Sequence, residues 1–157
     1  MPTKEGIMRK LLPALLFACL LMSTGAWAAG TITETWTAIG DRDYVLKFTC
    51  TADAADGSFP FYQTVKAVDG WVYLITTDPG STAPTDDYDI IIKDSEGVDI
   101  SGGMLANRDE SNSEQIIPKI NNNYVSRRVY GPLTIEITNN SVNSASVVVS
   151  VYFNRGP

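Results

Sequence analysis

The chain has 157 residues, 44% of them hydrophobic, and a formal net charge of −6 with no histidine. An acidic surface repels nucleic acid and anionic lipid, so neither is expected as a partner. The lack of histidine excludes Ser-His-Asp and Cys-His nucleophilic sites, and no glycine-rich nucleotide-binding motif is present.

The first 28 residues have the layout of a bacterial secretory signal peptide. Met8–Lys10 is a short cationic start, Leu11–Met22 is apolar, and Ala26–Ala28 is a small-x-small cleavage site. We therefore expect cleavage after Ala28 and an extracytoplasmic protein, periplasmic or secreted, with no membrane insertion once the peptide is removed. Three alternatives stay open: a start at Met1 rather than Met8, lipidation at Cys19, and a retained anchor.

The predicted mature chain, residues 29–157, is long enough for one domain and too short for two. Three of the 12 basic and one of the 18 acidic residues lie in the removed segment, which leaves 9 and 17 and a net charge of −8. Cys50 is then the only cysteine, so no internal disulfide forms and zinc lacks its usual ligand set. Cys50 shares a strand face with Leu46 and Phe48, which predicts a buried, unreactive thiol.

The first half of the mature chain alternates with a period of two, which predicts strands. Thr31–Ala38 and Tyr44–Thr51 are rich in residues that favour β-structure. Phe61–Val68 and Trp71–Thr77 flank Asp69-Gly70, the strongest two-residue hairpin signal in the chain, so we expect a hairpin there. Both faces of Trp71–Thr77 are apolar, which places this strand in the centre of a sheet.

The second half has longer loops between its strands. Asp78–Asp86 is rich in Pro and Gly, and Gly102–Gln115 is polar without a clear period. A loop as long as the second is often functional in a compact domain. The strands expected here are Tyr88–Lys93, Val98–Ser101, Tyr124–Tyr130, Leu133–Asn139 and Ala145–Phe153.

The expected fold class is all-β. We predict a single domain, an antiparallel β-sandwich of about eight strands, jelly-roll or immunoglobulin-like. No stretch of the mature chain shows a helical apolar stripe flanked by caps. In the last strand Val147, Val149, Val151 and Phe153 share one face, which predicts a stripe of core residues.

The clearest chemical signal is a group of carboxylates around the Tyr88–Lys93 strand. Calcium takes roughly six to eight oxygen ligands from flexible loops. The candidate ligands are Asp86, Asp87, Asp89, Asp94 and Asp99. In the opposing interpretation, aspartates begin turns by binding their own backbone and protect an edge strand from aggregation. No other cofactor is predicted.

No catalytic residue is predicted either. Glycoside hydrolysis needs two carboxylates at a set separation, and a chain with 17 acidic residues supplies such pairs by chance. We therefore expect that the protein is not an enzyme. Tyr62, Tyr124 and Tyr130 flank polar residues and are predicted at the surface, where aromatic rings stack on sugars or form protein interfaces. Arg127-Arg128 is predicted to lie on an exposed strand face.

The segment Asp86–Gly97, DDYDIIIKDSEG, resembles the DYD-strand-D-x-x-G signature of bacterial pre-peptidase C-terminal domains. Leu133–Asn139 and Val147–Phe153 are similar to the closing strands of those modules. The resemblance covers about half of the mature chain. It implies a secreted, non-catalytic jelly-roll sandwich, of a kind that in some members binds calcium.

A second set of segments is similar to a group of small uncharacterised proteins met among phage and prophage structural genes. The segments are Thr77–Gly80, Thr85–Asp86, Tyr88–Asp89, Ala106–Asp109 and Glu114–Gln115. That resemblance implies a virion component, such as a decoration or fibre-associated protein.

The sequence thus predicts an exported, non-enzymatic β-sandwich that acts by binding or assembly outside the cytoplasm. The alternatives are a phage-derived virion structural subunit, or a calcium-dependent module that binds carbohydrate or protein. The expected interaction surfaces are Asp78–Asp86, Gly102–Gln115 and the faces near Arg127 and Arg128. The partner, a protein or a glycan, is not identified, and a homo-oligomer is one possibility.

Overall fold

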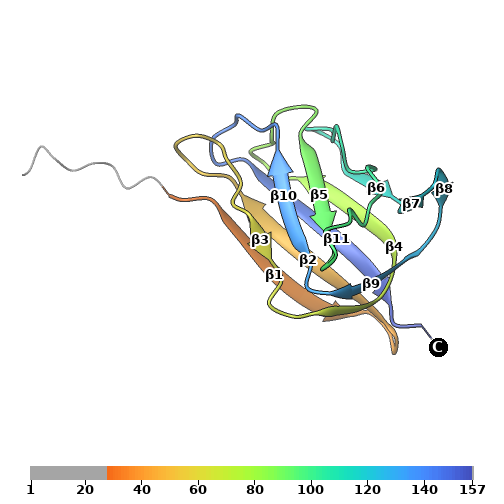
Figure 1. Ribbon diagram of the computed structural model, residues 1–157. Coiled ribbons are helices and arrows are strands. Elements are labelled where there is room, and N and C mark those ends of the chain that lie inside the picture. Colours follow the sequence, from red (N-terminus) through yellow and green to blue (C-terminus); the bar gives the residue numbers. More distant parts are fainter. Residues whose placement is uncertain (1–27, 157) are drawn as a thin grey trace, which may run out of the picture.

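The structure is a computed structural model that describes residues 28–156 (Figure 1). The predicted signal peptide lies outside the described residues except for Ala28, so it stays a prediction. Within the described part of the chain, no helix is long and apolar enough to cross a membrane.

Two antiparallel sheets and one small hairpin make up the described part of the chain (Figure 1). The larger sheet contains β1 (Thr31–Ala38), β2 (Asp43–Thr51), β11 (Ser146–Asn154), β4 (Val68–Pro79), β6 (Glu114–Ile116) and β9 (Arg127–Gly131). The smaller sheet contains β3 (Tyr62–Gln63), β10 (Thr134–Thr138) and β5 (Asp89–Lys93), and the hairpin is β7 (Lys119–Ile120) with β8 (Asn123–Tyr124).

The larger sheet has the order β1-β2-β11-β4-β6, and β9 also pairs with β4. The smaller sheet has the order β3-β10-β5, and every strand pair of both sheets is antiparallel. The protein is therefore an antiparallel β-sandwich, and the predicted fold class is confirmed. The central position predicted for Trp71–Thr77 is also correct, because β4 lies between β11 and the edge formed by β6 and β9.

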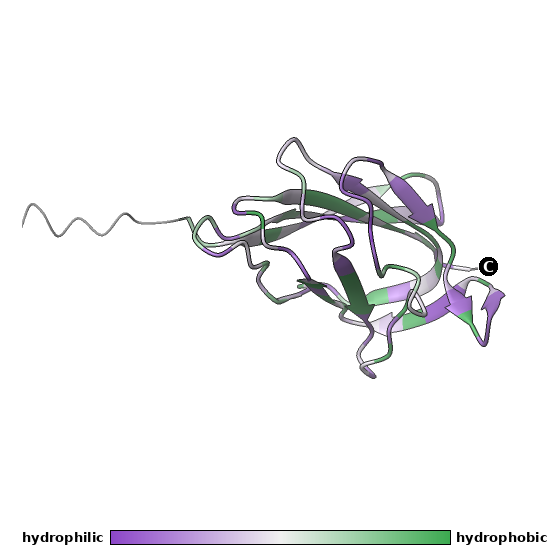
Figure 2. Ribbon diagram, turned by 90° about the horizontal axis from the view of Figure 1, so that it is seen from above, coloured by the Kyte–Doolittle hydropathy of each residue, from purple (hydrophilic) through white to green (hydrophobic). Residues whose placement is uncertain are grey.

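The core lies between the two sheets and follows the predicted alternation. All four residues of the β11 stripe, Val147 to Phe153 at every second position, are buried. Ile90, Ile92, Ile135 and Ile137 of the smaller sheet pack in the same cluster. Figure 2 shows the hydrophobic colour concentrated along the long strands and the hydrophilic colour over much of the loops. Burial of such branched side chains stabilises the fold by about 1.5–3 kcal/mol each.

The hairpin predicted at Asp69-Gly70 is wrong. These residues lie inside β4, where they pair with Tyr130 and Val129 of β9. Gly70 does not have a positive φ, and a Cβ there would lie 3.0 Å from the Asn154 carbonyl oxygen. Glycine is needed at this position for a close approach of the chain to β11 and not for a turn.

Three other predicted strands differ from the structure. Phe61–Val68 forms a strand only at Tyr62–Gln63, and Val68 is already the first residue of β4. Val98–Ser101 forms no strand and contributes only an isolated bridge between Asp99 and Lys93. Tyr124–Tyr130 is divided between β8 and β9, because its first part pairs with β7 and its second part with β4. One segment predicted as a single strand therefore contains two short strands with different partners.

Alanine substitutions at Gly70 and Gly40 test whether Gly70 is needed for close packing against β11. Gly70→Ala is expected to lower the free energy of unfolding by about 1–3 kcal/mol, because its methyl group overpacks against Asn154 and Tyr44. Gly40→Ala is the matched control, since the nearest atoms lie 3.9 Å from its Cβ position. Urea unfolding measures both variants. Equal stabilities would contradict the close packing at Gly70.

The Cys50 side chain is fully buried, as predicted, and burial raises the pKa of its thiol from 9.0 to about 12. We expect a thiol reagent at mildly alkaline pH to label Cys50 in urea but not in the folded protein, as measured by mass spectrometry of the Cys50 peptide. Because the folded pKa is the higher one, the thiol lowers stability as pH rises above about 9. Rapid labelling of the folded protein would contradict the burial.

Candidate functional site

The predicted calcium ligands lie at the two ends of β5 and do not form one cluster. Asp86, Asp87 and Asp89 precede or begin the strand, whereas Asp94 and Asp99 follow it. A strand of five residues is about 17 Å long. Among residues 28–156, no group of three or more His, Cys, Asp or Glu side chains is arranged to hold a metal ion.

Three of these carboxylates are engaged in turns and loop contacts. Asp94 Oδ1 accepts hydrogen bonds from the backbone N–H groups of Glu96 and Val98, each at 3.0 Å. Asp99 accepts bonds from the Ser101 N–H at 2.9 Å and the Gly103 N–H at 2.6 Å. These contacts match the alternative interpretation in which aspartate stabilises turns through the backbone.

Asp89 connects loops to β5. Its Oδ1 accepts a hydrogen bond from the Asn107 N–H at 2.8 Å, and its Oδ2 accepts one from the Asn139 side chain at 2.5 Å. Asp86 and Asp87 are exposed, and Asp87 has a positive φ of 64°. The five predicted ligands therefore have different structural roles.

The Arg127-Arg128 doublet does not form one exposed face. Arg127 retains 18% of its side-chain exposure, forms an ion pair with Asp94 at 3.5 Å and donates to the Asp99 carbonyl oxygen at 3.1 Å. Arg128 points to solvent and pairs with Asp69. The prediction fails for Arg127 because neighbouring strand residues point to opposite faces of a sheet.

Asp94→Ala tests whether this carboxylate acts through the turn or through calcium. The variant is expected to lose about 1–3 kcal/mol of unfolding free energy, because two backbone donors and Arg127 lose their acceptor. Asp86→Ala, at an exposed position, is the control and is expected to unfold like the unmodified protein. Urea unfolding is measured with calcium and with a chelator. A loss of unfolding free energy that occurs only in the presence of calcium would support the metal site instead.

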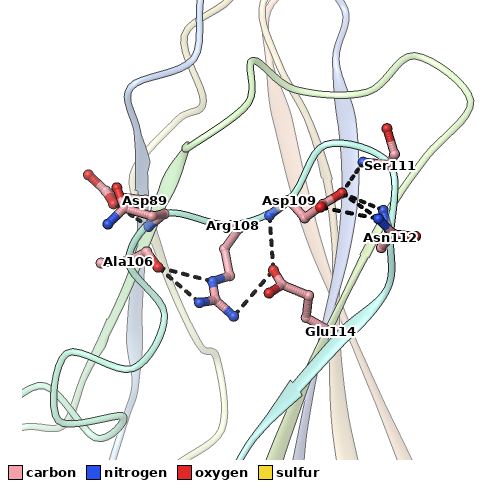
Figure 3. Close-up of polar contacts among 8 residues, drawn as sticks. Asp89, Ala106, Arg108, Asp109, Ser111, Asn112 and Glu114 are labelled. Carbon is pink, nitrogen blue, oxygen red and sulfur yellow. Dashed lines mark hydrogen bonds and ion pairs between the residues drawn. The ribbon is translucent and has the colours of Figure 1, made fainter.

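The predicted loop Gly102–Gln115 is held against β5 by a polar network (Figure 3). Arg108 donates to the Ala106 carbonyl oxygen at 2.9 Å and forms an ion pair with Glu114 at 3.3 Å. The Asp109 N–H donates to the same Glu114 carboxylate at 2.9 Å. The charged side chains of this loop therefore contact one another and hold it in a defined conformation.

Asp109 completes this network at the loop surface. It accepts hydrogen bonds from the N–H groups of Ser111 and Asn112, each at 2.7 Å (Figure 3). These bonds, the Ser111 bond first, hold the pKa of Asp109 below its ordinary value. The contacts are therefore present above the ordinary carboxyl pKa and are lost as pH falls through the lowered value.

Tyr88 lies beneath this loop and is fully buried. Within the described residues its hydroxyl group has no hydrogen-bond partner, and burial, followed by the Glu114 charge, raises its pKa to about 12. The phenol is therefore neutral at physiological pH and contributes to the core.

Two concave surfaces differ in what they offer a ligand. An apolar groove of about 380 Å³ is lined by Leu74, Met104, Gln115, Ile116, Ile117 and Tyr124. It presents few polar groups to orient a small molecule. The second, of about 440 Å³, combines aromatic rings with three charged side chains, and we call it the Trp36 pocket. Its lining residues are Trp36, Thr37, Ala38, Tyr44, Lys66, Ala67, Asp69 and Arg155.

The Trp36 pocket lies where the β1–β2 hairpin meets the start of β4 and the end of β11. Alternation on β1 and β2 turns Trp36 and Tyr44 toward the same face of the sheet, and both pack on Phe153 of β11. The ring centroids of Tyr44 and Phe153 are 5.3 Å apart, and those of Trp36 and Tyr44 are 5.8 Å apart. The pocket therefore has an aromatic wall supported by the core.

Glu34 fixes the orientation of this wall. Its Oε1 accepts a hydrogen bond from Trp36 Nε1 at 3.0 Å. Its Oε2 accepts bonds from the Tyr62 hydroxyl at 3.2 Å and the Val65 N–H at 3.0 Å. Because one carboxylate holds the indole and the segment beside it, Trp36 is oriented before any ligand binds.

Charged groups surround the aromatic wall. The Arg155 guanidinium lies 4.9 Å from the centroid of the Tyr44 ring, a cation–π distance. No carboxylate of residues 28–156 lies within ion-pair distance of Arg155 or Lys66, whereas Asp69 is neutralised by Arg128. The pocket thus has a local excess of positive charge on an acidic protein.

This pocket was not predicted from the sequence. Its residues come from separate parts of the chain, from Trp36 to Arg155, and no motif connects them. Of the three tyrosines predicted at the surface, Tyr124 and Tyr130 are 64% and 72% exposed. Tyr62 instead packs edge-on against Phe48, with ring centroids 6.2 Å apart. The period-two pattern predicts which face of the sheet Trp36 lies on, but not which residues of other strands lie next to it.

Comparisons with known proteins do not place the chain in a family. No protein-family model matches it, and no curated protein matches it. The solved structure of a cupin domain from Bordetella pertussis Tohama I is similar at 12% identity and a TM-score of 0.31. The similarity covers 81% of this chain and 97% of that one. So distant a likeness says nothing of what this chain binds.

Proposed function

We propose that the protein is a non-catalytic binding module that works outside the cytoplasm, and that the Trp36 pocket binds an acidic saccharide. The observation that carries the proposal is an oriented aromatic wall beside two cations without acidic partners among the described residues. Residues 1–28 support the location, because they have the layout of a signal peptide.

The aromatic wall suits the apolar face of a sugar ring. Trp36 and Tyr44 supply large, rigid surfaces, and their rotamers are fixed by Glu34 and Phe153. Since little side-chain freedom is left to lose, stacking on this wall costs little conformational entropy. The polar groups at the rim can then bind hydroxyl and carboxylate groups of the sugar.

The charges favour an anionic ligand over a neutral one. Within residues 28–156, Lys66 and Arg155 are the cations of the lining without an ion pair, and Arg presents a planar fork that matches a carboxylate. Of the described residues, Asp69 is the only acidic one in the lining, and it already pairs with Arg128. Glycoside hydrolysis requires two carboxylates across the bond, so this lining supports binding in preference to cleavage.

The proposal is tested by titration calorimetry with an acidic oligosaccharide, such as a polyuronate fragment, and its neutral counterpart. Lys66→Gln and Arg155→Gln are each expected to lower the affinity for the acidic oligosaccharide about tenfold, because each removes one charge-assisted contact. The neutral ligand should be affected little by either change. Binding of the acidic ligand should also weaken with added salt, because both cations are exposed.

Lys47→Gln is the matched control, since Lys47 is an exposed lysine on the opposite face of the sheet from Tyr44. It removes the same charge and is expected to leave affinity unchanged. Equal losses in Lys47→Gln and Lys66→Gln would show that net charge, and not the pocket, governs binding. Binding of neither oligosaccharide class would overturn the proposed ligand.

A further inference from the structure

β1 is a long outer strand with an open edge. It spans eight residues and, in the described part of the chain, pairs only with β2. Edge strands of this length template the addition of another strand unless charges, proline or a bulge protect them. β1 contains neither lysine nor proline, its register with β2 is unbroken, and its single charge is Glu34.

The backbone groups at this edge can be assigned from the register. Ile39 N–H donates to the Asp43 carbonyl oxygen at 2.9 Å, and residues of an antiparallel pair alternate between bonded and non-bonded positions. The odd-numbered residues, Thr31 to Thr37, therefore bond to β2. The N–H and C=O groups of the even-numbered residues, Ile32 to Ala38, point to the open edge, where no backbone partner occurs within residues 28–156.

Apolar side chains are exposed next to this edge. Val65 is 86% exposed and Phe61 is 64% exposed. Both flank β3, and the Val65 N–H bonds to Glu34 of β1 at 3.0 Å, so this segment lies beside the edge. Figure 1 shows β1 and β3 on the same side of the sandwich. One side of the molecule thus combines unpaired backbone groups with exposed hydrophobic residues.

We infer that β1 pairs with β1 of a second copy of the chain, in antiparallel orientation about a two-fold axis at Thr35. In this register Ile32 faces Ala38 and Glu34 faces Trp36 of the second copy. All outward-facing backbone groups of the strand are then paired, each facing pair exchanging two hydrogen bonds. Two sandwiches become joined through one continuous sheet.

The side chains of β1 favour its own sequence as the partner. Thr35 faces Thr35 and Thr33 faces Thr37 of the second copy, and cross-strand threonine pairs are favourable. The Glu34 carboxylate is satisfied internally and does not face its own copy. Shifting the register by two residues either opposes the two Glu34 side chains or leaves Ile32 outside the strand pair. Because the rest of the acidic chain repels a second copy, a nearly uncharged edge is where contact costs least.

The oligomeric state of the exported protein tests this inference. The full chain is expressed, purified in the form that accumulates outside the cytoplasm, and measured by size exclusion with light scattering at several concentrations. We expect twice the mass of one chain. Thr35→Glu places two carboxylates directly opposite at the axis and should raise the dimer dissociation constant about tenfold or more. The single chain tolerates this change, because Thr35 faces Lys47 of β2.

Thr49→Glu is the matched control, since Thr49 is an exposed threonine on β2, one strand away from the edge. It should remain a dimer. Thr35→Lys should also dissociate, and mixing it with Thr35→Glu should restore the dimer through opposite charges at the axis. A monomer at every concentration, a dimer unaffected by Thr35→Glu, or equal dissociation by Thr49→Glu would overturn the inference. Thr35 does not line the Trp36 pocket, so Thr35→Glu tests strand pairing without removing a side chain of the proposed saccharide site.

Discussion

The sandwich depends on the insertion of β11, the last strand of the chain, between β2 and β4. β11 pairs with β2 along its full length, and it brings one buried apolar stripe over the smaller sheet. Its pairing with β4 shifts at Tyr152 and Phe153, where one extra residue of β4 is accommodated. Three residues before this extra residue, Gly70 approaches Asn154, so the last residues of β11 fix the path of a strand far earlier in the sequence.

The same insertion builds the candidate site. Phe153 supports the rings of Tyr44 and Trp36, and Arg155, two residues later, lies over Tyr44. The pocket is therefore a product of sheet order and cannot form from the β1–β2 hairpin alone. Glu34 adds the connection to the smaller sheet, because Tyr62 of β3 shares its carboxylate with Trp36. Core packing and site orientation thus depend on the same few side chains.

Sequence patterns predicted the strands that alternate over many residues, because one buried face imposes a period of two. β1, β2, β5, β10 and β11 were predictable for this reason, and so were the buried Cys50 and the β11 stripe. The Asp69-Gly70 hairpin was wrong because the signal is local, whereas pairing with Tyr130 and Val129 of β9 is decided by residues far along the chain. The pocket could not be predicted for the same reason, because Lys66 and Arg155 come to line one pocket only when the sheets assemble.

The carboxylates of this acidic protein have two structural roles: some accept backbone hydrogen bonds in turns, and some form ion pairs with arginines. Asp94, Asp99 and Asp109 each accept backbone N–H groups, so their charges stabilise turns that would otherwise leave donors unpaired. Arg127 and Arg128 neutralise Asp94 and Asp69, and Arg108 neutralises Glu114. Lys66 and Arg155 have no such acidic partner among the described residues. Arg42, Lys47 and Lys119 also have no ion pair within residues 28–156, but of these five cations only Lys66 and Arg155 line the pocket with the oriented aromatic wall. This placement beside the wall, and not the missing ion pair alone, is the reason to propose binding there.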